Sequence, residues 1–253
     1  MILIPLPEKD FEPTEASLPW KRLQEAGREI VFATPQGKQA VADFRSLTGR
    51  GLGPWRPLLM AGSEGRAVYA EMEKDPGFKN PISYKEMNAS QFDGILLPGG
   101  HAPGMRQYLE SELLQDLAAE FFALDKPVGA ICHGVQILAR AASRSDSSHS
   151  PLFGRRTTTL PFWMEASAYM LTGLWLGNYF RTYNRSVQSE VVGALKNQSD
   201  FDPGPYSLAR DSYENPLRGF CLTDGNYVSA RWPGDASCFG YKFLELLNKG
   251  TKK

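Results

Sequence analysis

A strand that passes directly into a helix constrains this chain more than any other sequence feature. Residues 127–131, PVGAI, are apolar, and the helical segment HGVQILARAA begins right after Cys132 with no turn residue between them. In the sequence AICHG, the small residues Ala130 and Gly134 flank Cys132 two positions before and after it. This is the pattern of a nucleophile elbow, in which the central residue adopts a strained backbone conformation. We therefore predict a positive φ angle at Cys132.

The position of Cys132 also predicts its chemistry. A helix N-terminus presents unpaired N–H groups and a partial positive charge, which favour a thiolate over a thiol. The next residue, His133, is placed to accept the thiol proton or to orient a substrate. The alternatives are structural: a cysteine in an apolar strand is commonly a core residue, and a histidine at this position often caps its helix.

The rest of the chain alternates between strands and helices. Residues 1–6, 29–35 and 92–97 are short apolar runs, and a helical segment with Thr14 as its N-cap separates the first two. Strand, helix and strand in this order indicate parallel βαβ units. A hairpin turning at residues 224–226 and a closing helix follow near the C-terminus. The sequence therefore predicts one α/β domain over residues 1–253.

A glycine pair ends the strand that precedes the elbow strand. Gly99 and Gly100 stop the run FDGILLP and are followed by His101. Because ligands of parallel sheets bind at the carboxyl ends of the strands, the N–H groups of Gly100 and His133 are expected to form an oxyanion hole. A plain tight turn is the alternative for the two glycines.

Composition excludes several classes of protein. Basic and acidic residues both number 28, so no positive excess indicates a nucleic-acid or anionic-membrane partner. The three cysteines have no C-x-x-C spacing, and no cluster of histidines and carboxylates has metal-ligand spacing. We expect no metal and no cofactor. The N-terminus has no signal-peptide pattern, so we expect a cytoplasmic protein.

Three segments lie outside the basic pattern. Residues 44–63 contain glycines at 49, 51 and 53 without the spacing of a dinucleotide site, and they are expected to form a loop. Residues 155–160 are expected to form a strand. Residues 161–213 are expected to form a cap whose first helix packs on the core, because the uncharged run at 166–180 is too short to span a bilayer. The apolar stripe of that helix comprises Met164, Ala168, Leu171 and Trp175.

These motifs together resemble the ThiJ/PfpI superfamily. AICHG follows an apolar strand, LLPGGH stands about thirty residues earlier, and E-A-S-L-P follows the first strand. The resemblance implies a fold similar to class I glutamine amidotransferases: a flavodoxin-like, doubly wound parallel sheet with helices on both faces and a helical cap insertion at about 161–213. It also implies a homodimer. The GGH segment and the Cys-His pair are most similar to the heat-shock chaperone and glyoxalase III branch.

The resemblance assigns two further acids. In the family a glutamate four residues before a proline lies against the cysteine; Glu15 with Pro19 matches this spacing and Glu12 does not. From the residues alone, Glu15 is only a first-turn carboxylate that favours the helix dipole. The branch also places an acid after the cysteine to orient the histidine. Glu165 lies about where this acid is expected, and a solvent-facing helix residue is the equal alternative.

The sequence leaves three functions open. The first is a cofactor-independent cysteine enzyme acting on small reactive carbonyls, with methylglyoxal to lactate as its model reaction. The second is a holding chaperone or a redox sensor in which Cys132 is oxidised. The third is a related elbow-cysteine enzyme, such as an isocyanide hydratase, a peptidase or a biosynthetic enzyme. Glutaminase chemistry is disfavoured, because none of the three histidines lies beyond residue 149.

Overall fold

The computed structural model of the chain describes residues 1–142 and 148–250. A seven-stranded sheet forms its centre, with strand order β5-β3-β1-β6-β7-β9-β8. All neighbouring strands are parallel except β8 and β9, which form the predicted antiparallel hairpin. The five strands from β3 to β9 in this order correspond to the 2-1-3-4-5 arrangement of flavodoxin-like folds. The predicted fold class is confirmed.

The strands of the main sheet are short. They are β1 (Ile2–Pro5), β3 (Ile30–Thr34), β5 (Ile82–Ser83), β6 (Gly94–Leu97), β7 (Val128–Ile131), β8 (Cys221–Asp224) and β9 (Tyr227–Ala230). Every residue of β1, β6, β7 and β9 is buried, as expected for strands covered on both faces. A second, two-stranded sheet of β2 (Lys9–Phe11) and β4 (Val41–Ala42) lies beyond the carboxyl end of β1.

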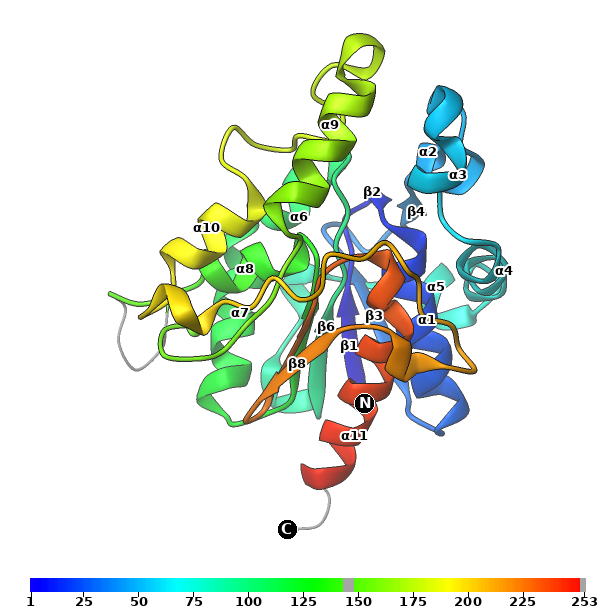
Figure 1. Cartoon of the computed structure of the whole chain (residues 1–253). Coiled ribbons are helices and arrows are strands. Elements are labelled where there is room, and N and C mark those ends of the chain that lie inside the picture. Colours follow the sequence, from blue (N-terminus) through cyan, green and yellow to red (C-terminus); the bar gives the residue numbers. More distant parts are fainter. Residues whose placement is uncertain (143–147, 251–253) are drawn as a thin grey trace.

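Helices cover the sheet on both faces (Figure 1). The principal ones are α1 (Pro13–Glu25), α4 (Ser63–Met72), α7 (Glu112–Ala123), α8 (Gly134–Arg140) and α11 (Ala236–Gly250). Helix α1 packs against α4 and α11, whereas α7 packs against α8. The remaining helices are α2 (Phe44–Thr48), α3 (Arg56–Leu59), α5 (Pro76–Lys79), α6 (Arg106–Leu109), α9 (Phe162–Leu176) and α10 (Val187–Gly193), of which α9 has 15 residues and the others at most seven.

Helix α1 begins two residues earlier than the sequence predicts. Its N-cap is Glu12, whose Oε2 accepts the N–H of Glu15 at 2.8 Å. Thr14, the predicted N-cap, lies inside the helix and donates its hydroxyl to Glu12 Oε1 at 3.1 Å. The prediction of Thr14 as the N-cap is wrong, because the longer side chain of Glu12 reaches the first turn from a position two residues before Thr14.

Two other local predictions are wrong. Residues 44–63 contain α2 and α3 rather than a continuous loop, with Asp43 capping α2 through the N–H groups of Arg45 and Ser46. Residues 155–160 form only an isolated bridge between Thr157 and Phe201. The hydroxyl groups of Thr157 and Thr159 form hydrogen bonds, and the N–H of Thr158 donates to the hydroxyl of Ser229. These side-chain hydrogen bonds take the place of a strand ladder.

Helix α9 begins at Phe162 after Pro161, as predicted, but it does not pack on the core along its whole length. Leu174 is 97% exposed and Trp175 is 47% exposed, and the C-terminal half rises away from the sheet (Figure 1). The helix is apolar on nearly every side, so the stripe alone did not identify its buried face. Across from α9, helices α2 and α3 rise on the opposite side of the carboxyl edge of the sheet (Figure 1).

Candidate active site

The elbow is present at the end of β7. Cys132 has φ of 56°, which confirms the positive angle predicted from AICHG. A Cβ added at Gly134 would lie 2.2 Å from the carbonyl oxygen of Leu97, so only glycine lets the elbow approach the end of β6 this closely. The Cys132 carbonyl accepts the hydroxyl of buried Thr159 at 2.7 Å. The close packing at Gly134 and the hydrogen bond from Thr159 therefore hold Cys132 in its strained backbone conformation.

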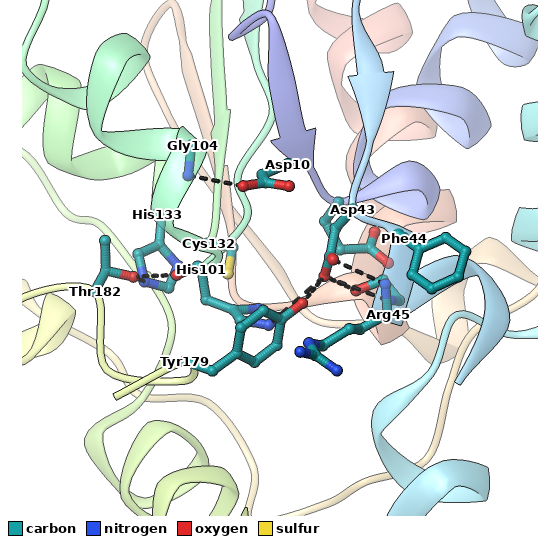
Figure 2. Close-up of polar contacts among 12 residues, drawn as sticks. Asp10, Asp43, Phe44, Arg45, His101, Gly104, Cys132, His133, Tyr179 and Thr182 are labelled. Carbon is teal, nitrogen blue, oxygen red and sulfur yellow. Dashed lines mark hydrogen bonds and ion pairs between the residues drawn. The ribbon is translucent and has the colours of Figure 1, made fainter. Parts of the chain in front are cut away.

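His133 lies beside the thiol. Its Nδ1 is 3.4 Å from Cys132 Sγ, and its Nε2 is 3.1 Å from the hydroxyl oxygen of Thr182. That hydroxyl donates to the carbonyl of His101 at 2.7 Å, so Thr182 connects the two histidines (Figure 2). Burial lowers the pKa of His133 to about 3, which keeps the imidazole neutral at physiological pH.

Glu15 reaches the cysteine from the first turn of α1. It is fully buried, its carboxyl contacts the Cys132 thiol, and its Oε2 accepts the N–H of Gly99 at 2.9 Å. Burial raises the pKa of Glu15 well above its ordinary value, and the neighbouring Glu12 raises it further. Glu12 also lines the pocket, and burial raises its pKa to about 7.

The pKa of Cys132 shifts in the direction opposite to the one expected from the helix N-terminus. Burial raises the thiol pKa well above its ordinary value, and the charge of Glu15 raises it further. The backbone N–H of His133 lowers it by less. The expectation that a helix N-terminus would favour the thiolate is therefore wrong for this site, because desolvation and a nearby carboxyl outweigh one amide dipole.

The two residues predicted to form an oxyanion hole differ in their relation to the pocket, because Gly100 lines it and His133 is fully buried. Gly100 lines the pocket beside Cys132 and has φ of 148°, a conformation that favours glycine. The N–H of His133 is directed toward the sulfur. A Cβ added at Gly99 would lie 2.8 Å from the nitrogen of His133, so the two loops are in close contact.

Glu165 lies in the first turn of α9 and also lines the pocket. It is 6% exposed, and its Oε2 accepts the N–H of Val187 at 3.0 Å, which joins α9 to α10. Burial raises the pKa of Glu165 to about 7. At His133 Nε2 the structure places Thr182, not Glu165.

A cluster that the sequence did not indicate completes one wall of the site. The ring of His101 stacks on Phe180 with a centroid distance of 4.3 Å, and its Nε2 is 3.9 Å from Asp43 Oδ2. Tyr179 donates its hydroxyl to the same carboxylate oxygen (Figure 2). These residues come from loops far apart in the sequence, and no local motif marks Asp43, Tyr179 or Thr182.

The site lies where the fold places ligands. Glu15 follows β1, Gly100 follows β6 and Cys132 follows β7, all at the carboxyl ends of adjacent parallel strands. The strand order reverses between β1 and β6, and this is the switch point at which flavodoxin-like folds bind ligands. The pocket there has a volume of about 240 Å³.

Comparison with known proteins identifies the family. Residues 6–205 match the ThiJ/PfpI family-like sequence family. The chain belongs to the ThiJ/PfpI family. A deglycase of Pyrococcus abyssi is 26% identical over 247 residues, covering 98% of this chain and 99% of the relative. A deglycase of Pyrococcus horikoshii is 29% identical over 242 residues, covering 96% of each.

Solved structures of similar proteins share the fold. Glyoxalase III from Candida albicans superimposes with a TM-score of 0.66 at 17% identity, covering 97% of each chain. The Rapid Encystment Protein 24 KDa of Francisella tularensis superimposes with a TM-score of 0.68 at 16% identity, covering 97% of this chain and 98% of that one. Within the residues that the structure describes, no helix is both long and apolar enough to cross a membrane.

Proposed function

We propose that this ThiJ/PfpI protein is a cysteine-dependent enzyme that converts a reactive 2-oxoaldehyde to the 2-hydroxy acid without a cofactor, with methylglyoxal to lactate as the model reaction. One observation carries the proposal: the Cys132 thiol contacts both the neutral imidazole of His133 and the carboxyl of Glu15, which can hold a proton. This thiol lies at a strained elbow and lines a pocket. Relatives named deglycases and a structural neighbour named glyoxalase III favour carbonyl chemistry.

The first proposed step is addition to the aldehyde. Cys132 Sγ forms a bond to the aldehyde carbon, and the thiol proton passes to the aldehyde oxygen, which gives a hemithioacetal. The N–H groups of Gly100 and His133 stabilise the negative charge that develops on this oxygen. His133 holds the thiol through Nδ1, while Thr182 fixes the orientation of its ring.

The second step moves hydrogen between the two substrate carbons. A proton leaves the sulfur-bearing carbon and is added to the neighbouring carbon, and the hydroxyl proton of the hemithioacetal passes to the ketone oxygen, so that the ketone becomes an alcohol and a thioester remains on Cys132. Glu15 is the proton carrier in this proposal, because its raised pKa suits both acceptance and donation, whereas His133 with a pKa of about 3 is a weak base. Water then forms the new C–O bond, the C–S bond breaks, and the thiol and the 2-hydroxy acid are released.

The test is consumption of methylglyoxal and formation of lactate by the wild type, Cys132→Ser and Cys238→Ser. Cys238 is a matched control because it is also buried and free but lies on α11. We expect the wild type and Cys238→Ser to form lactate and Cys132→Ser to form none. Equal activity of the two variants would refute the proposal. Oxidation of Cys132 without any turnover would favour the redox-sensing alternative. The homodimer and the cytoplasmic location stay predictions.

A further inference from the structure

The pocket above Cys132 has two different ends. Cys132, Glu15 and Gly100 lie at the end formed by the carboxyl ends of the strands. The upper part of the pocket is walled by apolar side chains from two segments on opposite sides. Leu160 lies before α9, and α9 itself contributes Met164 and Leu171 next to the carboxyl of Glu165. The other wall comprises Leu58 of α3 and Met60, which directly follows that helix. Figure 1 shows α9 and α2–α3 rising on the two sides of this space.

The two walls are joined to each other. Trp175 near the end of α9 donates its Nε1–H to the carbonyl of Gly51 at 2.8 Å. Leu52, Met60 and Phe180 form a separate small buried cluster between the two segments. The apolar walls are therefore held at a fixed separation by their own packing. Three residues of the predicted stripe line the pocket: Met164, Ala168 and Leu171. The periodic apolar face of α9 therefore forms part of the pocket wall.

The two ionisable groups on the walls of the pocket are engaged with the protein: Glu165 accepts the N–H of Val187, and Arg210 is bonded to the 58–60 wall. Arg210 lines the pocket, but its Nη2 donates to the carbonyls of Leu58 at 3.2 Å and Met60 at 3.1 Å. The guanidinium also lies 5.1 Å from the ring of Trp232 and faces the charge of Glu12. Arg210 thus fixes the 58–60 wall and already faces a carboxylate, so an uncharged substrate group fits this space better than an anion.

We propose that the preferred substrate is a 2-oxoaldehyde bearing an aryl or branched-alkyl group, and that this group binds between α9 and residues 58–60; this inference rests on the proposed function. An apolar group gains free energy in proportion to the area it removes from water, and the methyl of methylglyoxal leaves most of these walls uncovered. The volume of about 240 Å³ is sufficient for a ring. A dry apolar cavity of about 150 Å³ admits benzene in another protein.

The test compares phenylglyoxal with methylglyoxal. We expect the wild type to show a kcat/KM at least about tenfold higher for phenylglyoxal, the size of effect that hydrophobic pockets give. Ala168→Leu, which fills the pocket, is expected to lower kcat/KM for phenylglyoxal more than for methylglyoxal, so that most of this preference is lost. Ala166→Leu is the matched control, since Ala166 lies two residues away on α9 and lines a different surface hollow. If Ala168→Leu does not fold, Ser167→Leu replaces it, because Ser167 is exposed and also lines the pocket.

The outcomes separate this inference from the proposed function. Equal or better turnover of methylglyoxal by the wild type would overturn the substrate preference and leave the proposed function standing. The same holds if Ala168→Leu and Ala166→Leu affect phenylglyoxal equally. Absence of Cys132-dependent turnover with both aldehydes would refute the proposed function itself, and this inference with it.

Discussion

Glu15 Oε2 accepts the N–H of Gly99 at 2.9 Å, so the first helix and the loop after β6 are joined beside Cys132. A Cβ added at Gly99 would lie 2.7 Å from that oxygen, which explains why the loop carries a glycine at this position. Pro19, four residues after Glu15, lacks the N–H that would bond to the Glu15 carbonyl in a regular helix. The glutamate-proline spacing by which Glu15 was assigned therefore lies in the turn of α1 that carries the Glu15 carboxyl to Cys132.

Gly134→Ala is expected to destabilise the protein by about 2–3 kcal/mol, because the added methyl meets the Leu97 carbonyl at 2.2 Å and forces the packed elbow apart. Gly173→Ala is the control. It lies within α9, where an added Cβ has its nearest contact at 3.4 Å, so helix propensity should make that change neutral or stabilising by up to about 1 kcal/mol. Urea unfolding measures both. Equal free energies of unfolding for the two variants would contradict the steric explanation.

Thr182→Val should reduce kcat by roughly 10- to 100-fold, the effect expected when a reacting group is misplaced by a fraction of an ångström. Valine keeps the shape but removes the hydroxyl between His133 Nε2 and the His101 carbonyl. Thr182→Ser keeps the hydroxyl and should restore activity. Nitrogen-15 NMR of the His133 ring tests the positioning role directly, since only the valine variant should change the tautomer populations. Indistinguishable spectra and rates for the two variants would count against this role.

Glu165→Gln should change how stability depends on pH. Burial raises the folded-state pKa of Glu165 to about 7 from 4.5, so between these values the folded state holds a proton that the unfolded state has lost. The contribution of this group to stability is therefore present below pH 4.5 and lost as pH rises through about 7. Glutamine keeps an oxygen for the Val187 N–H and cannot ionise.

We expect Glu165→Gln to be more stable than the wild type by ~1–3 kcal/mol at pH 8 and to differ little at pH 4.5, from the free energy that corresponds to a shift of this size. Thermal or urea unfolding across this pH range measures the difference. Gln188→Glu, on the neighbouring α10 helix with its amide oxygen bound to the Phe162 N–H, adds a carboxyl to the same cap region and serves as a control for charge alone. If the free energies of unfolding of Glu165→Gln and the wild type differ by the same amount at every pH, Glu165 does not titrate as described.

The sequence predicted those parts of the site that depend on neighbouring residues. The elbow at Cys132 follows from small residues two positions away, and the β6 loop follows from two consecutive glycines. These features are local, and local sterics decide them. Thr182 and Asp43 were not predicted, because tertiary packing alone brings them to His133 and His101.

The electrostatic state of the site was predicted incorrectly for a related reason. A helix N-terminus can be recognised from sequence, so the expectation for Cys132 relied on it. The family resemblance placed Glu15 against the cysteine, but the burial of both groups depends on the assembled fold. Burial and the charge of Glu15 both raise the thiol pKa. Of the predicted stripe on α9, Met164, Ala168 and Leu171 line the pocket and Trp175 is half-exposed, because periodicity does not distinguish a face that packs on the core from one that lines a pocket.

Glu15→Gln should lower the pKa of Cys132 and also lower turnover. The charge of Glu15 raises the thiol pKa, so its removal allows the thiolate to form at lower pH. Glutamine cannot carry a proton between the substrate carbons, so turnover should fall by ~100-fold or more, as for loss of a general acid or base. A variant with more thiolate and less activity would separate proton transfer from nucleophile activation.

Glu12→Gln is the matched control for this prediction. Glu12 is also buried in the pocket, but its carboxylate caps α1 through the Glu15 N–H, and its effect on the thiol pKa is smaller than that of Glu15. We expect Glu12→Gln to lower the thiol pKa less and to retain most of the activity. Ultraviolet thiolate titration and turnover of the aldehyde are measured on both variants in parallel. If Glu12→Gln is the more damaging change, or if neither variant loses activity, the proton carrier is not Glu15.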